Sequence, residues 1–321
     1  MPMEASRIKA YLMRRLGARV GRGVRFGRKS FILCRNFEET VIGDRTRLGD
    51  HCLITVGSLR TGDDVRFDSE VRVRGRGNLS LGHGCYVGAR SYIDVNRDVV
   101  IEDDAGVGPG SWIFTHSVWQ SVLEGGPRAF APVRIEKNAW IPANVFIMPG
   151  VTVGAGSIVG ARSLVSSDIP PGVFAAGTPA RVIKTAEERD SEIPDGQSRR
   201  DIIASLLEDF RKAALELHIA DDCKQQTFGD LEVYTFLRRA VTRDLLAVCT
   251  TRLRPEHLAS VKNATTWFAA GGIDPSSFHL LKDCAWFDVE LRRRSDDWDD
   301  FNELLHEVSR GEYGIRFRIA K

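Results

Sequence analysis

Residues 135–165 read IEKNAW-IPANVF-IMPGVT-VGAGSI-VGARSL-V, with an aliphatic residue at every sixth position. A helical face would repeat near 3.6 residues and a half-buried strand would alternate every two. The period of six therefore predicts a coil that contributes one short strand per hexapeptide. We expect six aliphatic side chains to point into this coil: Ile135, Ile141, Ile147, Val153, Val159 and Val165.

The same spacing extends upstream with interruptions. It is found at Leu81, Val87, Ile93 and Val99, then slips by two residues to Ile101, Val107 and Ile113, and is weaker at Ile42, Leu48 and Ile54. Glycines that follow an inward aliphatic residue, such as Gly43 and Gly82, are expected to give the corners backbone freedom. Residues 60–78 fit the repeat poorly, and residues 117–132 must loop out of it. Three hexapeptides per coil would give roughly nine coils in a prism about 40 Å long at the usual strand separation.

The pattern divides the chain into four parts. We predict a basic N-terminal helix within residues 1–19 (about Arg7 to Leu16), a coil domain at 20–184, a linker at 185–200 and an α+β domain of unknown role at 201–321. In the last part the spacing predicts helices at 202–217 (capped by Ser198), from 255 to before 271 and at 296–309, and strands at 285–292 and 315–319.

Composition narrows the classes of protein. The 321 residues are 43% hydrophobic and 27% charged, which is typical of a globular protein with room for two domains. Six cysteines without a CxxC pair, and no apolar run long enough to span a bilayer, favour a cytoplasmic location. Basic residues are not interleaved with aromatic ones, so we expect no nucleic-acid partner. The basic N-terminus could instead contact an anionic surface such as a membrane.

Residues 81–184 carry more specific motifs. These are Ile-Phe-Thr-His at 113–116, the looped segment, Ala-Pro-Val-Arg-Ile at 131–135, Ala-Trp-Ile-Pro-Ala-Asn-Val-Phe-Ile-Met-Pro-Gly-Val-Thr-Val-Gly at 139–154, and an ending that closes with Gly-Thr-Pro-Ala-Arg-Val-Ile-Lys at 177–184. Together they resemble the maltose and galactoside acetyltransferases and the polysaccharide O-acetyltransferases of the hexapeptide-repeat superfamily. The resemblance implies that the coil is a left-handed parallel β-helix, so the expected fold is mainly β, with the small α+β domain behind it.

The resemblance also implies an O-acetyltransferase that moves an acetyl group from acetyl-CoA directly onto a hydroxyl of a sugar or polysaccharide unit, without a metal. His116 stands where the relatives have their catalytic base. Asp94 matches a carboxylate that contacts the sugar, and Trp119 in the looped segment is expected to contact the acceptor. Donor-binding positions are matched by Trp140, Ala143, Ala161 and Ser166 along the pantetheine channel and by Arg181 and Lys184 at the nucleotide end. A homotrimer with the site between neighbouring prisms is expected.

Some positions depart from the pattern and some alternatives stay open. Pro142 replaces a residue that is commonly Gly, Ser167 a residue that is often basic, and Tyr86 an Asn that touches the acceptor. Asp94 could instead be a corner residue that satisfies backbone amides. An N-acyltransferase of an amino sugar, a metal-dependent prism enzyme using three histidines (His51, His83 and His116), and a non-catalytic scaffold that binds partners through its tail are the competing functions.

Overall fold

A computed structural model describes residues 2–118, 120–126, 128–190 and 196–217, and beyond them the shorter stretches 220, 222–228, 231–238, 242–249, 253–261, 264, 266–269, 273, 275, 281, 285–288, 293–294, 305 and 318–319. The chain divides into two compact units, residues 1–193 and residues 194–321. Each unit is described by itself.

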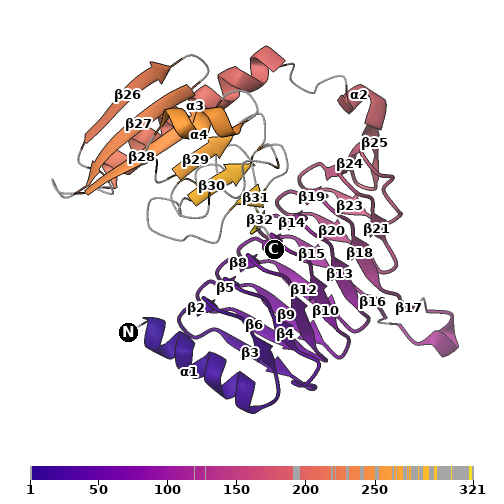
Figure 1. Ribbon diagram of the computed structural model, residues 1–321. Helices are drawn as coiled ribbons and strands as arrows, with labels where there is room; N and C mark the ends of the chain where they lie inside the picture. The colour runs from indigo at the N-terminus through magenta and orange to yellow at the C-terminus, as the bar shows by residue number, and fades with distance from the viewer. Residues whose placement is uncertain are drawn as a thin grey trace. The chain divides into compact units, whose positions relative to one another are not determined.

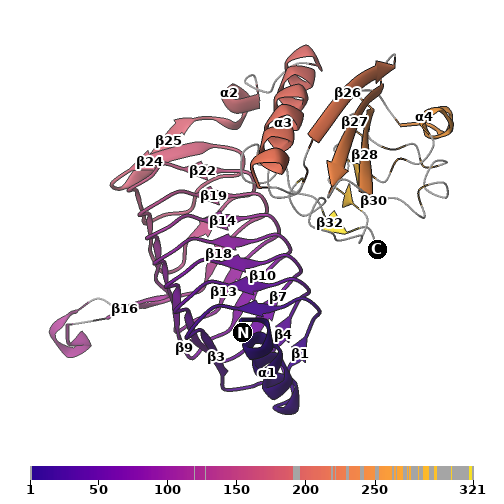
Figure 2. The same cartoon turned by 90° about the vertical axis from the view of Figure 1, so that its left-hand side faces the viewer.

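The first unit is a left-handed β-helix whose coils stack three parallel sheets into a prism (Figure 1, Figure 2). Sheet A consists of β1 (Arg19–Val20), β4 (Val41–Ile42), β7 (Leu59–Thr61), β10 (Leu79–Leu81), β13 (Val99–Ile101), β18 (Val133–Ile135) and β21 (Thr152–Val153). Sheet B consists of β2 (Arg25–Phe26), β5 (Arg47–Leu48), β8 (Arg66–Phe67), β11 (Tyr86–Val87), β14 (Gly106–Val107), β19 (Trp140–Ile141), β22 (Ile158–Val159), β24 (Phe174–Gly177) and β25 (Ala180–Lys184). Sheet C consists of β3 (Phe31–Cys34), β6 (Leu53–Val56), β9 (Arg72–Gly75), β12 (Tyr92–Val95), β15 (Trp112–Ile113), β20 (Phe146–Ile147) and β23 (Leu164–Val165).

The inward aliphatic ladder is confirmed. All six residues from Ile135 to Val165 in the period-six run have 0% of their surface exposed, and the upstream set from Val87 to Ile113 is equally buried. These side chains form one continuous core along the coils. Each coil alone would leave its apolar side chains and its backbone edges in water, so stacking supplies both the core and the hydrogen bonds.

The expected number of coils is wrong. Seven coils contribute a strand to each of the three sheets among the described residues, rather than about nine. Leu59, Leu79 and Val99 stand in register, so these coils are 20 residues long, whereas Ile135 and Val153 are 18 residues apart. The two extra residues explain the slip after Val99. Residues 60–78 form an ordinary coil within β7, β8 and β9, although their outward side chains are arginines.

The corner glycines have a different role from the one expected. A Cβ on Gly43 would lie 2.2 Å from the Gly62 carbonyl oxygen, and Gly43 itself does not have a positive φ. Gly after an inward aliphatic residue is therefore required by the close approach of the next coil. The left-handed backbone position lies two residues further on and tolerates Arg45 (φ 55°) and His51 (φ 59°).

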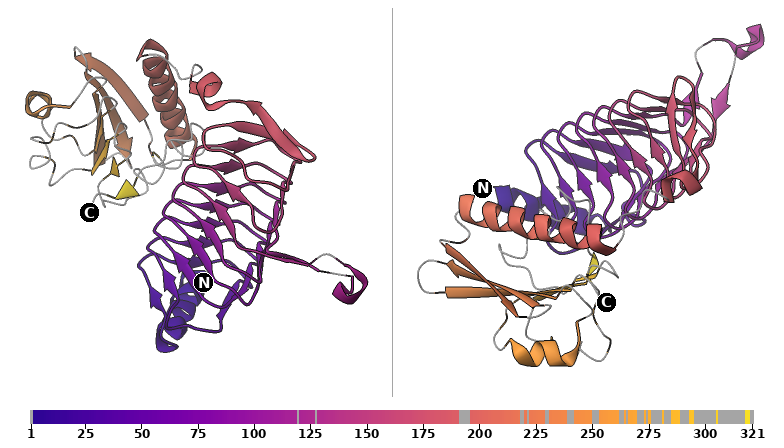
Figure 3. Two further views of the ribbon diagram at one scale, coloured as in Figure 1. Left: turned by 90° about the vertical axis from the view of Figure 1, so that its right-hand side faces the viewer. Right: turned by 90° about the horizontal axis from the view of Figure 1, so that it is seen from above.

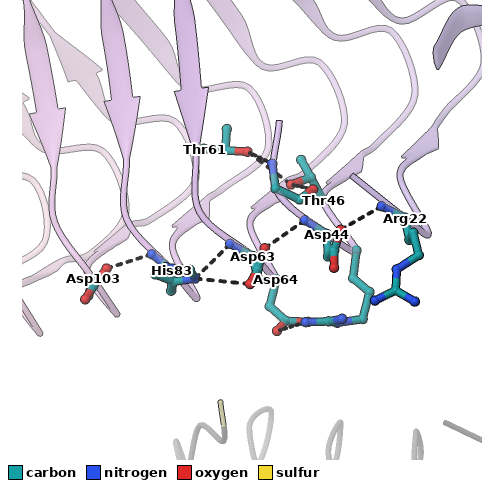
Figure 4. A network of polar contacts seen from close by, with 10 residues as sticks. Arg22, Asp44, Thr46, Thr61, Asp63, Asp64, His83 and Asp103 are labelled. Carbon is teal, nitrogen blue, oxygen red and sulfur yellow. Dashed lines mark hydrogen bonds and ion pairs between the residues drawn. The ribbon is translucent and has the colours of Figure 1, made fainter. Parts of the chain in front are cut away.

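The prism has three edges, where one sheet gives way to the next. We name them the A/B edge (for example residues 82–85), the B/C edge (88–91) and the C/A edge (96–98 and 114–132). On the A/B edge a side chain of one coil accepts the backbone N–H of the coil before it (Figure 4). Asp63 Oδ1 accepts from the Asp44 N–H (2.8 Å), and Asp103 Oδ1 accepts from the His83 N–H (2.7 Å). These corners are therefore satisfied from within the fold.

Helix α1 (Pro2–Arg15) packs against the first coil, with Met13 in the core. Lys9 Nζ donates to the Ser30 carbonyl (2.8 Å), and Arg14 donates to the Val20 and Gly21 carbonyls. Burial lowers the pKa of the Lys9 ammonium. Lys9 and Arg14 thus donate to backbone carbonyls of the first coil. Without the helix, the strands of that coil would form open sheet edges.

The last coils end in a hairpin and a short helix. Strands β24 and β25 pair antiparallel, and α2 (Ala186–Asp190) follows them. The linker expected at 185–200 therefore contains helix. Thr185 and Glu188 form a reciprocal capping box (2.7 and 3.3 Å), and Arg189 donates to the Gly156 and Gly172 carbonyls. Thr-x-x-Glu at residues 185–188 is thus the sequence signal for the start of α2.

The second unit contains one sheet in the order β26 (Asp222–Phe228), β27 (Leu231–Arg238), β28 (Thr242–Cys249), β29 (Thr266–Ala269), β30 (Ala285–Asp288), β31 (Arg293–Arg294) and β32 (Arg318–Ile319). Its described residues include helices α3 (Gly196–Glu216) and α4 (Pro255–Ser260) (Figure 3). Leu206 and Phe210 of α3 belong to the same core as Phe268 of the sheet, and Trp267 belongs to a second core.

Several expectations for this unit need correction. Residues 266–269 form a buried strand rather than the end of a helix, because Trp267 and Phe268 each enter a different core. Ser198 lies inside α3 and does not cap it. Strands β26, β27 and β28 were not predicted. The helix expected at 296–309 falls outside the described residues apart from Leu305.

Candidate active site

The C/A edge departs from the regular prism at His116. After β15 the chain enters β16 (His116–Ser117), leaves the coil, forms the short helix η1 (Val122–Glu124) and returns through β17 (Ala129–Phe130) (Figure 2, Figure 3). His116 and Phe130 face each other as an antiparallel pair. The looped segment expected at 117–132 is therefore a hairpin that begins at the candidate base. Trp119 lies outside the described residues.

Asp94 and His116 meet at this edge. The distance from His116 Nδ1 to Asp94 Oδ1 is 2.8 Å. The Asp94 side chain is 3% exposed and the His116 side chain 35%, so the carboxylate is buried and the imidazole reaches the surface. Strand β12 carries Asp94 on the coil that precedes His116, and coil stacking brings two residues 22 positions apart into contact.

The Asp94 carboxylate is held by several further donors. Oδ1 accepts from Thr115 Oγ1 (2.6 Å), and Oδ2 accepts from Asn96 Nδ2 (2.9 Å). The Thr115 hydroxyl also lies 3.1 Å from the Arg97 backbone N–H, for which it is the acceptor. A buried carboxylate with this many hydrogen bonds is fixed in position and remains an acceptor.

This arrangement sets the tautomer of His116. An ionised Asp94 can only accept, whereas Asn96 Nδ2, which lies 3.2 Å from Nδ1, can only donate. We assign the ring proton to Nδ1, which donates it to Asp94 Oδ1, because the contact with the carboxylate is the shorter of the two. Nε2 is then the acceptor of the neutral ring, and it faces away from the carboxylate. The Asp94 oxygens contact the side chains of His116, Thr115 and Asn96. Oδ1 also accepts the backbone N–H groups of Asn96 and Thr115 (3.3 Å each), which is the role expected of a corner residue that satisfies backbone amides.

Phe130 stacks on the imidazole, and two arginines lie against Phe130. The His116 and Phe130 rings stack with centroids 5.7 Å apart and planes at 28°. The guanidinium carbons of Arg97 and Arg128 lie 5.0 and 5.4 Å from the Phe130 centroid. Sequence reasoning missed Asn96, Arg97 and Phe130. Their spacing was the available signal, because Asn96 stands 20 residues before His116 and coils here are 20 residues long.

The expected donor residues lie on other parts of the prism. Trp140 is on the outer surface of sheet B, while Ala143 and Ala161 occupy the same position on successive coils of the B/C edge, where the Arg162 N–H donates to the Ala143 carbonyl (3.1 Å). Arg181 and Lys184 are exposed on β25 of sheet B. Of the predicted donor residues only Ser166 follows sheet C toward the C/A edge. One chain therefore does not bring His116 and the donor set together.

Tyr86 belongs to the side of the prism that carries Trp140. Its ring stacks on Trp140 with centroids 6.5 Å apart, and its hydroxyl donates to Asp68 Oδ2 (2.7 Å). Register places Tyr86 and Trp140 on either side of Gly106 in sheet B. Because Gly106 has no side chain, the rings of Tyr86 and Trp140 can meet across it. Tyr86, which stands where the resemblance predicts an Asn, therefore lies on the outer surface of sheet B beside Trp140.

The histidines of the metal alternative are separated by their local contacts. His83 Nδ1 accepts from the Asp63 N–H (2.9 Å) on the A/B edge (Figure 4), and His51 occupies a left-handed corner of the B/C edge. Across the described parts of the chain, no group of three His, Cys, Asp or Glu side chains is placed to hold a metal ion.

Comparison with known proteins gives the following matches. Residues 132–167 match the model of the bacterial transferase hexapeptide (six repeats). Galactoside O-acetyltransferase of Escherichia coli (strain K12) is 36% identical over 120 residues, 35% of this chain and 59% of that protein. Nodulation protein L of Rhizobium meliloti (strain 1021) is 39% identical over 107 residues, 33% of this chain and 58% of that protein. The chain thus spans less than two thirds of the length of these curated relatives.

A longer match is a putative acetyltransferase of Staphylococcus aureus (strain MRSA252), 30% identical over 177 residues, 50% of this chain and 87% of that protein. Similar solved structures include AntD, an N-acyltransferase from Bacillus cereus, at 17% identity and TM-score 0.41 over 61% of this chain and 95% of that one. Another is the polySia specific acetyltransferase NeuO, at 23% identity and TM-score 0.32 over 53% of this chain and 85% of that one.

A left-handed β-helix of hexapeptide repeats, with an Asp–His pair where a hairpin leaves one edge, defines a class of transferase. The sequence matches assign the chain within that class. It belongs to the hexapeptide-repeat acyltransferase superfamily.

Proposed function

We propose that this protein is an acetyl-CoA-dependent O-acetyltransferase that acts on a hydroxyl of a sugar or polysaccharide unit, with His116 as the general base. The observation that supports this most directly is the 2.8 Å contact between His116 Nδ1 and the buried Asp94 carboxylate. It leaves Nε2 as a surface-facing acceptor with a fixed ring orientation. A base held in this way needs no reorganisation before it takes a proton.

The reaction follows from that geometry. Nε2 takes the proton of the acceptor hydroxyl as its oxygen attacks the thioester carbonyl of the donor. Asp94 stabilises the imidazolium formed, and His116 then returns the proton to the departing thiolate of CoA. The products are an acetyl ester and free CoA. Transfer is direct, so no covalent enzyme intermediate is required.

Donor binding is assigned to the predicted positions on sheet B and the B/C edge. The small side chains of Ala143 and Ala161 leave the corner open for an extended pantetheine arm beside Trp140, and exposed Arg181 and Lys184 supply positive charge for phosphates. Ser166 would contact the thioester end. Acetyl-CoA is an intracellular metabolite, so this proposal includes a cytoplasmic location. In the described part of the chain no helix is long and apolar enough to cross a membrane.

A homotrimer would complete the site. Ala143 and Ala161 lie on the B/C edge of sheet C and His116 on its C/A edge. The outer surface of sheet C carries a chain of ring contacts among Tyr92, Trp112, Phe114 and Phe146, with centroids 5.3–6.4 Å apart. Trp112 and Phe146 are each 41% exposed. An exposed aromatic surface of this kind favours burial against another copy. Packing it against a neighbouring prism would place the C/A edge of one chain beside the B/C edge of another.

Two measurements test the proposal. Calorimetric titration should show saturable binding of acetyl-CoA near one site per chain, and transfer to sugar acceptors should be followed by CoA release and by mass analysis of ester or amide products. His116→Ala should retain the wild-type Tm, and its transfer rate should fall by a factor of about 10² to 10⁴, because the base is removed. Full turnover by His116→Ala would contradict the assignment of His116 as the base. Absence of donor binding at millimolar concentration would instead favour a non-catalytic scaffold that binds partners. An amide product would favour an N-acyltransferase of an amino sugar.

A further inference from the structure

The C/A edge carries more positive charge than the proposed chemistry requires. Arg97 and Arg128 are both exposed, they come from different coils, and their guanidinium carbons lie 5.0 and 5.4 Å from the centroid of one ring, that of Phe130. That ring stacks on His116. The two cations therefore lie against the aromatic ring that stacks on the imidazole.

A third arginine lies on the same surface. Arg74 of β9 is exposed and pairs in register with Asp94 of β12, so its side chain projects from the outer surface of sheet C one coil below the Asp–His pair. Arg97, Arg128 and Arg74 thus approach the site from three segments: the corner before β13, the looped hairpin and sheet C.

Nearby carboxylates are already engaged. Asp94 is buried against His116 and Thr115, and Asp98 Oδ1 accepts the Asn78 N–H (2.9 Å). Within the part of the chain that the structure describes, no ion pair joins Arg97 or Arg128 to an acidic residue. The Arg97 Nη1 donates to the Asn96 carbonyl (3.0 Å), which leaves its other donors directed to the surface.

Like charges gathered around one ring repel each other, and a stacked aromatic side chain offsets only part of that repulsion. A bound oxyanion would offset it fully and would use the planar donor geometry of guanidinium. We propose that the acceptor is anionic and that Arg97 and Arg128 bind its negatively charged group, so that a neighbouring hydroxyl is presented to His116. This inference rests on the proposed function, and it adds the substrate class.

Two chemical sources can supply the anion: the carboxylate of a sugar acid or a phosphate attached to a sugar. The wild-type protein should be assayed with acetyl-CoA and two matched pairs of acceptors. Methyl β-glucuronide and its neutral amide differ only at the carboxyl group, and glucose 1-phosphate and methyl α-glucoside differ in the phosphate. We expect the charged member of one pair to have kcat/KM at least about tenfold higher, and the pair that shows this identifies the source.

The arginine variants separate recognition from catalysis. Arg97→Gln and Arg128→Gln should each raise KM for the charged acceptor about tenfold, with a much smaller change in kcat or in KM for acetyl-CoA. The neutral acceptor should be affected far less. Arg60→Gln is the matched control, because Arg60 is also an exposed strand arginine but lies on sheet A, away from the C/A edge. It should leave all parameters unchanged.

Direct binding makes the test independent of turnover. Calorimetric titration with glucuronate and with inorganic phosphate should show binding of one of them to wild-type protein and to Arg60→Gln, weakened about tenfold in Arg97→Gln. Equal transfer to charged and neutral acceptors would overturn the proposal of an anionic acceptor, and so would anion binding that neither Arg97→Gln nor Arg128→Gln weakens. Neither result would contradict the proposed acetyltransferase activity. Arginine-dependent anion binding without transfer to any acceptor would have the opposite meaning: the anion site would stand and the proposed function would fail.

Discussion

Two edges of the same prism each present a histidine close to an aspartate, and the two pairs differ in what Nδ1 meets. On the A/B edge, His83 Nδ1 accepts a backbone N–H from Asp63 (2.9 Å), and the Asp63 carboxylate oxygen Oδ2 is 3.6 Å away (Figure 4). On the C/A edge, His116 Nδ1 faces the carboxylate of Asp94 (2.8 Å). The first ring is an acceptor that caps a coil, whereas the second is assigned as a donor whose remaining nitrogen is the proposed base.

The difference shows how a repetitive fold makes room for chemistry. Along the A/B edge the Asp and His side chains are used one after another to satisfy the N–H of the preceding coil, as at Asp44, Asp63 and His83. At the C/A edge side chains also accept backbone N–H groups, as Thr115 Oγ1 does for Arg97 and Asp94 Oδ1 does for Asn96 and Thr115. There, however, the Asp94 carboxylate also contacts the side chains of Thr115, Asn96 and His116. The polar side chains of the candidate site thus gather where the chain leaves the repeat.

Asp94→Asn should have the largest effect on this contrast. An amide at this position can donate to Nδ1, which moves the ring proton to Nε2 and removes the base. We expect kcat for acetyl transfer to fall by about 10² to 10⁴ while the fold is kept, since the substitution preserves shape. Steady-state transfer rates and thermal unfolding measure the two properties.

The matched control is Asp103→Asn on the A/B edge, where the Asp103 Oδ1 oxygen accepts the His83 N–H (2.7 Å). Asparagine keeps that acceptor, so transfer should continue at the wild-type rate. If Asp94→Asn and Asp103→Asn were equally active, the two edges would not differ in the way described, and Asp94 would be a structural cap.

His83→Ala should affect stability and leave transfer intact. Its loss leaves the Asp63 N–H without its acceptor, which costs about 1 kcal/mol in the free energy of unfolding at this partly exposed corner. Chemical denaturation measures the cost. His83→Asn should recover most of it, because an asparagine side chain also offers an acceptor oxygen. A drop in kcat for His83→Ala at unchanged stability would contradict the assignment of this edge to structure.

The comparison also explains what sequence could predict. Inward aliphatics such as Ile141 and Val153 repeat because every coil meets the same core, so the period predicted a coil with one short strand per hexapeptide, and the family resemblance predicted the left-handed β-helix. Coil length did not, since 18 and 20 residues per coil bury the same aliphatic ladder. His116 was found through its motif, but Asn96 and Arg97 depend on which residues the next coil brings alongside. In the second unit Trp267 was misassigned, because a short buried strand has no period that separates it from a helix.

The smallest effect concerns Cys85, at the end of the A/B corner of residues 82–85. Burial raises the pKa of the Cys85 thiol to about 12, and the charges of Asp104 and Asp103 act in the same direction. A folded pKa above the unfolded one means that the protonated thiol contributes stability in full below the unfolded pKa, and that this contribution is lost as pH rises toward 12. By pH 9 the unfolding free energy of the wild type should have fallen about 0.5 kcal/mol more than that of Cys85→Ala, relative to pH 7. Denaturation in reducing buffer at the two pH values measures this difference, and cysteines shared by both proteins cancel. Equal pH slopes would show that the Cys85 thiol ionises in the folded protein as readily as in the unfolded chain. Water would then reach the Cys85 thiol at the A/B corner, contrary to its burial in the structure.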